Sequence, residues 1–151
     1  MQRNITYKSF IKYVVWSLLF ALYAALSTVY LFLPPMIGVL FLLFHYAQTR
    51  KNSLLLLFVL IDVVILEALK GFLAFSLLLY FLLQERFIIP KIKQSINARH
   101  LRNFLYVAFS YFGYFLFSAL LAQIFLLPRI ELDFYIVYYI VVEFLIVSIA
   151  L

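Results

Sequence analysis

The sequence predicts an all-α integral membrane protein, a bundle of six transmembrane helices with both termini in the cytoplasm. Of its 151 residues, 68% are hydrophobic and only 12% are charged, whereas a soluble domain is roughly half apolar and a quarter charged. Ten of the twelve Lys and Arg residues fall into three clusters, and long apolar stretches separate them. The composition indicates a membrane protein, and the clusters indicate the number of crossings.

The basic clusters predict the topology. They are Arg3, Lys8 and Lys12; then Arg50 and Lys51; then Arg86, Lys91, Lys93, Arg99 and Arg102. Basic residues are enriched in cytoplasmic loops, so the chain between successive clusters should cross the bilayer an even number of times. Two crossings per interval leave Lys70 and Arg129 as the only basic residues on the outer face.

The first two spans lie on either side of a proline pair. Residues 13–33 match the roughly 20 residues that cross the hydrocarbon core. Pro34 and Pro35 end this span, because proline cannot continue a regular helix. The second span, 36–47, is short and needs a locally thin bilayer or help from its flanking residues.

The next apolar segment, 54–87, is too long for a single crossing. As one helix it would extend about 50 Å, well beyond a hydrocarbon core of about 30 Å. A turn at Gly71, where the backbone is permissive, divides it into spans 54–66 and 72–83 and returns the chain to the cytoplasm. We therefore expect a hairpin, with one kinked helix as the alternative.

Residues 84–103 are polar and basic and contain Pro90, which predicts a cytoplasmic loop that faces anionic lipid headgroups. The last two spans, 104–127 and 134–151, are separated by a short outer turn. The net charge is +6. Because the basic residues flank apolar spans, we attribute this charge to contact with membrane lipid and expect no nucleic-acid partner.

Three acidic residues in or beside the spans are candidates for function, because ionisable groups in a membrane are costly. Asp62 and Glu143 fall near mid-membrane on antiparallel helices. They could form a proton or cation relay, or each could be a neutral packing device, and the packing interpretation is favoured. Glu67 precedes Lys70 by three residues, and we expect a weak ion pair between them at the outer turn.

Small residues at four-residue spacing predict faces where another helix approaches closely. They are Ser17, Ala21 and Ala25 on the first span, and Ser118 and Ala122 on the fifth. Packing within the chain and packing against a partner both remain open.

The sequence offers no set of residues for catalysis. It contains no cysteine, no phosphate-binding loop, and none of the nucleophile or zinc motifs of hydrolases. Its two histidines, His45 and His100, fall in different environments and lack the spacing of metal ligands. We therefore expect a protein that is not an enzyme and that has no cofactor or metal.

The segment from Pro35 to Tyr80 resembles the MreD family. Pro35 opens the second span, and IGVLFLLFHYAQTRK, LLLLFVLIDVV with Asp62, Gly71 and FLAFSLLLY follow. The family has a proline, an apolar run with a basic break, an aspartate and a glycine at the corresponding places. Here the interval from Asp62 to Gly71 is one residue longer than in the family, and other residues replace the glycines that usually flank the aspartate.

This resemblance implies a non-enzymatic scaffold of the bacterial elongasome in the inner membrane. Such a scaffold binds MreC and helps couple MreB filaments to lateral peptidoglycan synthesis and rod shape. RodA and its transpeptidase partner are further implied partners. The alternative is a small transporter subunit or proton-coupled channel that binds a small ligand within the bundle.

Overall fold

The computed structural model describes residues 2–128 and 133–150, and it is almost entirely helical over these residues, without a β-strand. The all-α prediction is therefore confirmed. The helices are α1 (Gln2–Val29), α2 (Ile37–Thr49), α3 (Ser53–Lys70), α4 (Ser76–Leu83), the π-helical turn η1 (Gln84–Ile88), α5 (Ile89–Ser95), α6 (Arg99–Phe125) and α7 (Tyr135–Ala150).

α4, η1 and α5 form one continuous helical rod, because the backbone at both junctions keeps the right-handed helical conformation. Pro90 does not end this rod. The π-helical turn precedes it, and such a turn changes the hydrogen-bond spacing next to a residue that has no N–H to donate. The expected loop over 84–103 is therefore wrong in its conformation, since helix covers all of it except residues 96–98.

The helix boundaries differ in smaller ways from the expected spans. α1 ends at Val29, before the proline pair, and the second span begins one residue later and extends to Thr49. α3 continues to Lys70, and Gly71 follows it in the left-handed conformation with φ of 69°. The chain thus turns where the sequence places the turn, and α3 and α4 are two separate helices.

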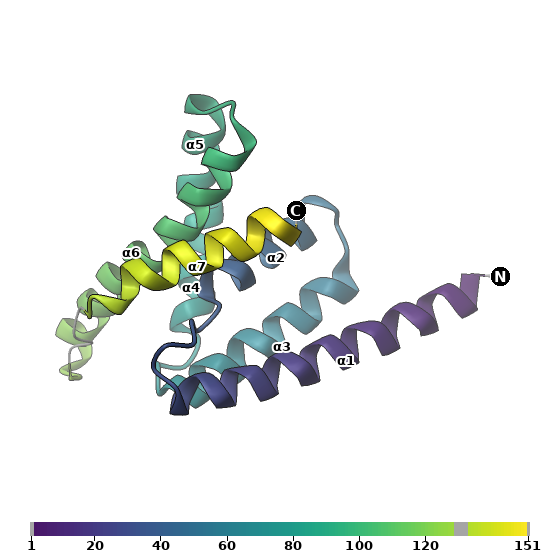
Figure 1. Cartoon of the computed structure of the whole chain (residues 1–151), viewed down its shortest axis with the longest axis horizontal. Coiled ribbons are helices and arrows are strands. Elements are labelled where there is room, and N and C mark those ends of the chain that lie inside the picture. Colours follow the sequence, from purple (N-terminus) through teal and green to yellow (C-terminus); the bar gives the residue numbers. More distant parts are fainter. Residues whose placement is uncertain (1, 129–132, 151) are drawn as a thin grey trace.

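α2 lies at the centre of the molecule and packs against α3, α6 and α7. α1 and α3 lie side by side, and the rod of α4, η1 and α5 stands across this pair (Figure 1). Leu40, Phe41 and Phe44 of α2 are buried together with Phe81 of α4 and Val107 of α6. The core therefore lies around α2, which corresponds to one of the two shortest predicted spans.

Successive turns gather alternately at the two ends of the molecule. At one end, a cavity is bounded by the end of α2, the end of α5, the start of α6 and the end of α7; its lining includes Arg50, Lys93, Arg99 and Ala150. At the other end, a cavity of about 210 Å³ is bounded by the 30–36 turn, the 71–75 turn and the start of α7; its lining includes Pro35, Phe72, Asp133 and Tyr135.

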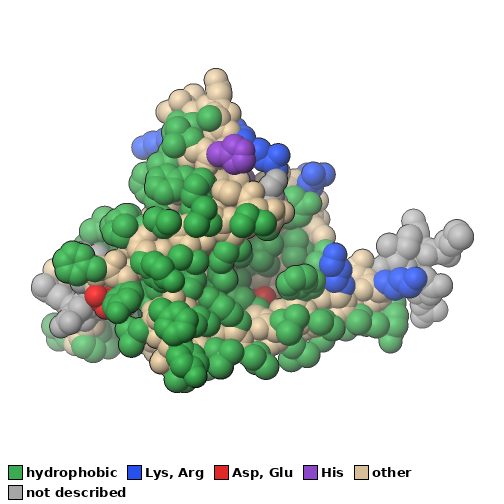
Figure 2. Space-filling view, in the orientation of Figure 1, with side chains coloured by type: hydrophobic (Ala, Val, Ile, Leu, Met, Phe, Trp, Pro, Cys, Tyr) green, Lys and Arg blue, Asp and Glu red, His purple; other side chains and the backbone are tan. Residues whose placement is uncertain are grey.

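Apolar side chains cover most of the face shown in Figure 2, and Lys and Arg side chains gather toward its upper and right-hand edges. Two helical stretches, Tyr7–Val29 and Arg99–Phe125, are long and apolar enough to cross a membrane. Only 6% of the apolar stretch in α1 is buried. A largely exposed apolar helix of this length is typical of a membrane protein.

Candidate functional site: buried acids and two joined cavities

Asp62 links α3 to α1. Its side chain is 8% exposed and accepts a hydrogen bond from the Ser17 hydroxyl. It also lines a cavity of about 610 Å³ between α1, α2, α3 and α7, whose other lining residues are mostly aliphatic and aromatic. Figure 2 shows a hollow on this face with an acidic side chain inside it. Among the described residues, the aspartate is therefore both a helix contact and the one acidic group on the cavity wall.

Glu143 of α7 caps the start of α2. The side chain is 0% exposed; one carboxylate oxygen accepts from the Tyr111 hydroxyl, and the other accepts from the Val39 amide at 3.1 Å. Met36, which precedes α2, has a left-handed backbone with φ of 61° and provides no side-chain cap. A distant carboxylate thus takes the place of the usual local capping residue.

Close packing at α2 depends on Gly38. A Cβ atom at this position would lie 2.8 Å from Glu143 Oε2 and 2.8 Å from Val107 Cγ1. Only glycine lets α2 approach both α6 and the carboxylate of α7 this closely.

Glu67 caps the start of α4 in the same way. It is 3% exposed, and its two carboxylate oxygens accept from the Phe75 amide at 2.9 Å and the Leu77 amide at 2.6 Å. Phe75 is another left-handed residue without a side-chain cap. Negative charge at a helix start is favourable because the first amides have no partner within the helix.

The prediction of an ion pair between Glu67 and Lys70 is wrong. Lys70 instead donates from Nζ to the backbone oxygen of Ser27 at 2.6 Å, near the end of α1. Each charged group thus meets the helix end of opposite polarity, an acid at a helix start and a cation at a helix end.

The structure does not bring Asp62 and Glu143 into contact. Asp62 bonds Ser17 on α1, whereas Glu143 bonds Tyr111 on α6 and the start of α2. No hydrogen bond between the two carboxylates is present in the part of the chain that the structure describes. The geometry therefore gives no support to a proton or cation relay between Asp62 and Glu143.

The small residues divide into buried and exposed positions. Ser17 is buried against α3, Ala21 is partly buried, and Ala25 is exposed. Ala24 is buried in its place, at 1% exposure. Steps of four residues rotate around a helix by about 40° each, so a stripe with that spacing leaves the face that Ser17 fixes. On α6, Ser118 and Ala122 are both buried.

A polar stripe that was not apparent from the sequence joins the rod to α6. Its pairs are Ser76 with Tyr114, Tyr80 with the backbone of Phe109, and Gln84 with Ser110 and the backbone of Tyr106. The three rod residues recur every four positions within an apolar stretch. That spacing is the local signal that could have revealed them.

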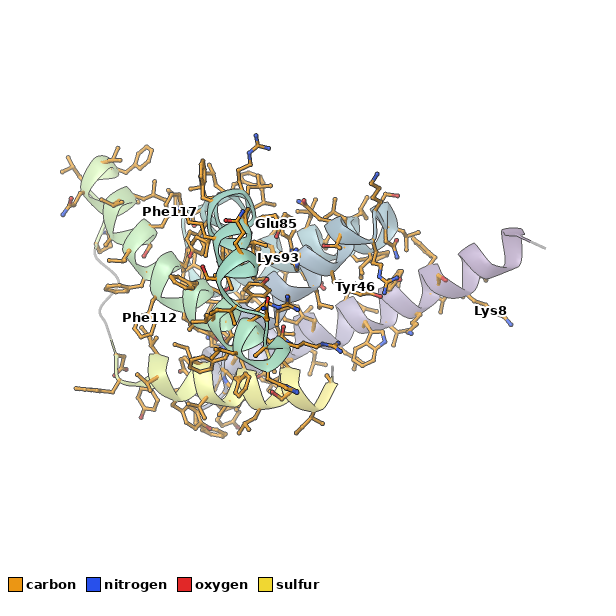
Figure 3. The ribbon with its side chains drawn as sticks, turned by 90° about the horizontal axis from the view of Figure 1, so that it is seen from above. Lys8, Tyr46, Glu85, Lys93, Phe112 and Phe117 are labelled. Carbon is orange, nitrogen blue, oxygen red and sulfur yellow. The ribbon has the colours of Figure 1, made fainter. Side chains whose placement is uncertain are left out.

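Three of the five basic residues expected in the loop line the cavity between the ends of α2, α5 and α7 and the start of α6, which we call the cavity at the basic end. These are Lys93, Arg99 and Arg102, and Lys12 of α1 and Arg50 at the end of α2 join them. Arg86 and Lys91 are exposed and lie outside this lining. Figure 3 shows Lys93 and Glu85 on the rod, Tyr46 between the rod and the outer part of α1, and Lys8 farther out along α1.

The family-motif positions have structural roles of different kinds. Pro35 is buried in the turn before α2, and Asp62 faces α1. A Cβ atom added to Gly71 would meet no atom within 4 Å, so the positive φ alone explains glycine there.

Arg129 lies outside the described residues. Among those residues, no group of three or more His, Cys, Asp or Glu side chains could hold a metal ion. Comparison of the chain with protein-family models, with curated proteins and with solved structures finds no match.

Proposed function

We propose that the chain is a six-span, non-enzymatic scaffold of a bacterial inner membrane, of the kind that the resemblance to MreD implies. Its partners would be an MreC-like protein and, through it, the synthases of lateral wall growth. The proposal has two parts, a topology and a docking face, and different observations support each.

The alternation of the turns supports six crossings. The first, third and fifth turns of the chain would lie outside, and the two between them would lie inside with both termini. Because the cavity lined by Arg50, Lys93 and Arg99 is at the end with the second and fourth turns, the bias of basic residues makes that end cytoplasmic.

The exposed face of α1 is the observation that carries the scaffold function. α1 packs mainly on α3, and its other side presents large apolar residues at alternating steps of four and three. They are Ile11, Val15, Leu18 and Leu22, with Ala25 and Val29 continuing the series. This heptad spacing is typical of a helix that packs along its length against a second helix. The transmembrane helix of a single-pass partner fits that face.

The hydrogen bonds of the buried acids Glu67 and Glu143 also support a scaffold function. Glu67 and Glu143 are both engaged with the starts of short helices. Their carboxylates stabilise broken helices within the bundle, and that role needs no reaction.

Site-specific photocrosslinking in native membranes tests the docking face. A benzoylphenylalanine at Leu22 should crosslink to a co-expressed MreC-like protein, whereas one at Leu57, which is similarly exposed on α3, should not. A second probe is placed at Leu18 on the same face. If neither the probe at Leu18 nor the one at Leu22 crosslinks to this partner, the scaffold proposal is rejected. Equal capture from Leu57 would place the contact on another face.

A second candidate is a transporter subunit that binds a small ligand. The cavity of about 610 Å³ beside Asp62 and Ser17 favours it, because ligand pockets are commonly about 300–1,000 Å³ with a few polar groups. Asp62→Asn should then abolish uptake without loss of complex assembly. Normal uptake by the variant would remove this candidate.

A further inference from the structure

The cavity at the basic end is a cleft of about 980 Å³ with a strongly one-sided charge. Five cationic side chains from four parts of the chain line it, and no Asp or Glu among the described residues does; the cations are Lys12, Arg50, Lys93, Arg99 and Arg102. The acid beside it, Glu85, is paired with His45 of the cleft wall at 2.8 Å. The geometry therefore favours an anion.

Tyr106 adds a buried donor to this cleft. Its side chain is 4% exposed and lines the cleft, and its hydroxyl has no hydrogen-bond partner among the described residues. The hydroxyls of Tyr80 and Tyr114 are both bonded. A buried hydroxyl without a partner is costly, and ring contacts with Phe41 and His45 hold this one in place. The Tyr106 O–H and the guanidinium groups that line the cleft are hydrogen-bond donors, and the oxygens of one phosphate can accept from them together.

The cleft continues into the apolar cavity beside Asp62. The two share the lining residues Trp16, Val39, Leu43, Tyr46, Ile146 and Ala150. A cationic mouth thus opens onto an apolar space between α1, α2, α3 and α7. Free phosphate would use only the mouth, whereas a lipid with a phosphate headgroup would use both parts.

We propose that the cleft and the apolar cavity form one binding site for an anionic phospholipid. The headgroup phosphate lies among Arg99, Arg102 and Lys93 with the Tyr106 hydroxyl, and an acyl chain lies in the apolar cavity beside Trp16. The site does not use the proposed scaffold face, because none of the α1 residues of that face lines either cavity. An acyl chain here would compete with a ligand of the transporter candidate.

Trp16 is the only tryptophan of the chain, and it lines both cavities, so its fluorescence reports on bound lipid. Purified protein in a neutral detergent would be mixed with phosphatidylglycerol and phosphatidylcholine, with bromine on the acyl chains of one or the other. Bromine quenches nearby tryptophan. We expect stronger quenching when the anionic lipid carries the bromine, and equal quenching by both lipids would overturn the proposal.

Two double variants with the same loss of charge locate the effect. Arg99→Gln with Arg102→Gln should reduce the preference for the anionic lipid by about fivefold for each cation removed. Arg86→Gln with Lys91→Gln, outside the cleft, should leave it unchanged. An equal reduction in both double variants would indicate general surface charge and contradict a built site.

Two further measurements complete the test. Tyr106→Phe removes only the hydroxyl and should weaken the preference without unfolding the protein, so the test does not depend on the arginine variants being stable; an unchanged preference would contradict the role of the hydroxyl. Excess inorganic phosphate, at an ionic strength matched with chloride, should displace the lipid only weakly. Full displacement by phosphate would show a free-anion site and overturn the assignment to lipid.

Discussion

Gly113 of α6 lies directly against the hydroxyl of Tyr80 on α4. A Cβ atom on Gly113 would lie 2.6 Å from Tyr80 Cζ and closer still to the Tyr80 hydroxyl oxygen. The same hydroxyl donates to the backbone oxygen of Phe109 at 2.5 Å, one turn before Gly113 on α6. The glycine therefore makes room for a polar contact that joins the rod to α6.

Gly113→Ala should destabilise the protein by about 1–3 kcal/mol, because the added methyl group must push the tyrosine ring out of a packed site. The free energy of unfolding can be measured by titration with SDS in mixed micelles. Tyr80→Phe in the same chain should recover part of the loss, because the closest contact is with the hydroxyl. A Gly113→Ala variant as stable as the native chain would contradict the contact.

Glu67→Ala should destabilise the protein more than Glu67→Gln does. The alanine leaves the amides of Phe75 and Leu77 without an acceptor, whereas glutamine keeps one oxygen. Loss of a helix cap costs about 1–2 kcal/mol, and buried amides without partners add to that cost. Glu85→Gln, which disturbs a partly exposed pair with His45, is the control and should change the unfolding free energy by less than about 1 kcal/mol.

Tyr111→Phe and Tyr106→Phe form a matched pair on one helix. The Tyr111 hydroxyl donates to Glu143, so its removal should cost about 1–3 kcal/mol by leaving a buried carboxylate oxygen with one donor fewer. The Tyr106 hydroxyl has no partner among the described residues, so its removal should be neutral or stabilising in lipid-free detergent. Thermal unfolding of both variants checks this order, and the reverse order would show that the two hydroxyls are wrongly placed.

The helical class and the turn at Gly71 could be predicted because they depend on local features, namely apolar runs, charge clusters and a permissive residue. The start of α2 could not. Its cap, Glu143, lies 104 residues after Val39 in the sequence, and nothing near Met36 indicates such a contact. Pro90 indicates a break in the helix, but a π-helical turn accommodates it within the rod.

The candidate site was predictable only in part for the same reason. The sequence identifies Asp62, Glu67 and Glu143 as exceptional because they are acids in an apolar chain. Their partners are backbone amides and hydroxyls that only the fold brings near. The cleft likewise recruits Lys12 and Arg50 from clusters that are distant in the sequence, and it leaves out Arg86 and Lys91.

Ser17→Ala and Asp62→Asn should interact energetically, since the Ser17 hydroxyl donates to the Asp62 carboxylate. Hydrogen bonds between membrane helices contribute about 0.6 kcal/mol on average, with a maximum of about 1.7. A double-mutant cycle of unfolding free energies should therefore give a coupling within that range. Additive effects would mean that the pair does not hold α1 against α3.

Single introduced thiols test the topology on which the proposed function depends, because the chain contains no cysteine of its own. Leu73→Cys lies in the turn between α3 and α4, and Ala98→Cys lies between α5 and α6; both positions are exposed. In spheroplasts, a membrane-impermeant maleimide should label the thiol at position 73 and should reach position 98 only after the membrane is opened.

Both thiols should label equally in detergent, which controls for their reactivity. Labelling of position 98 but not of position 73 from outside would show that the protein has the opposite orientation, with the basic cleft at the outer leaflet. Labelling of both from outside would mean that the rod from Ser76 to Ser95 does not cross the bilayer, and six crossings would then be excluded. The basic cleft can meet anionic lipid of the inner leaflet only if position 98 is protected, so this measurement also limits where the proposed lipid is drawn from.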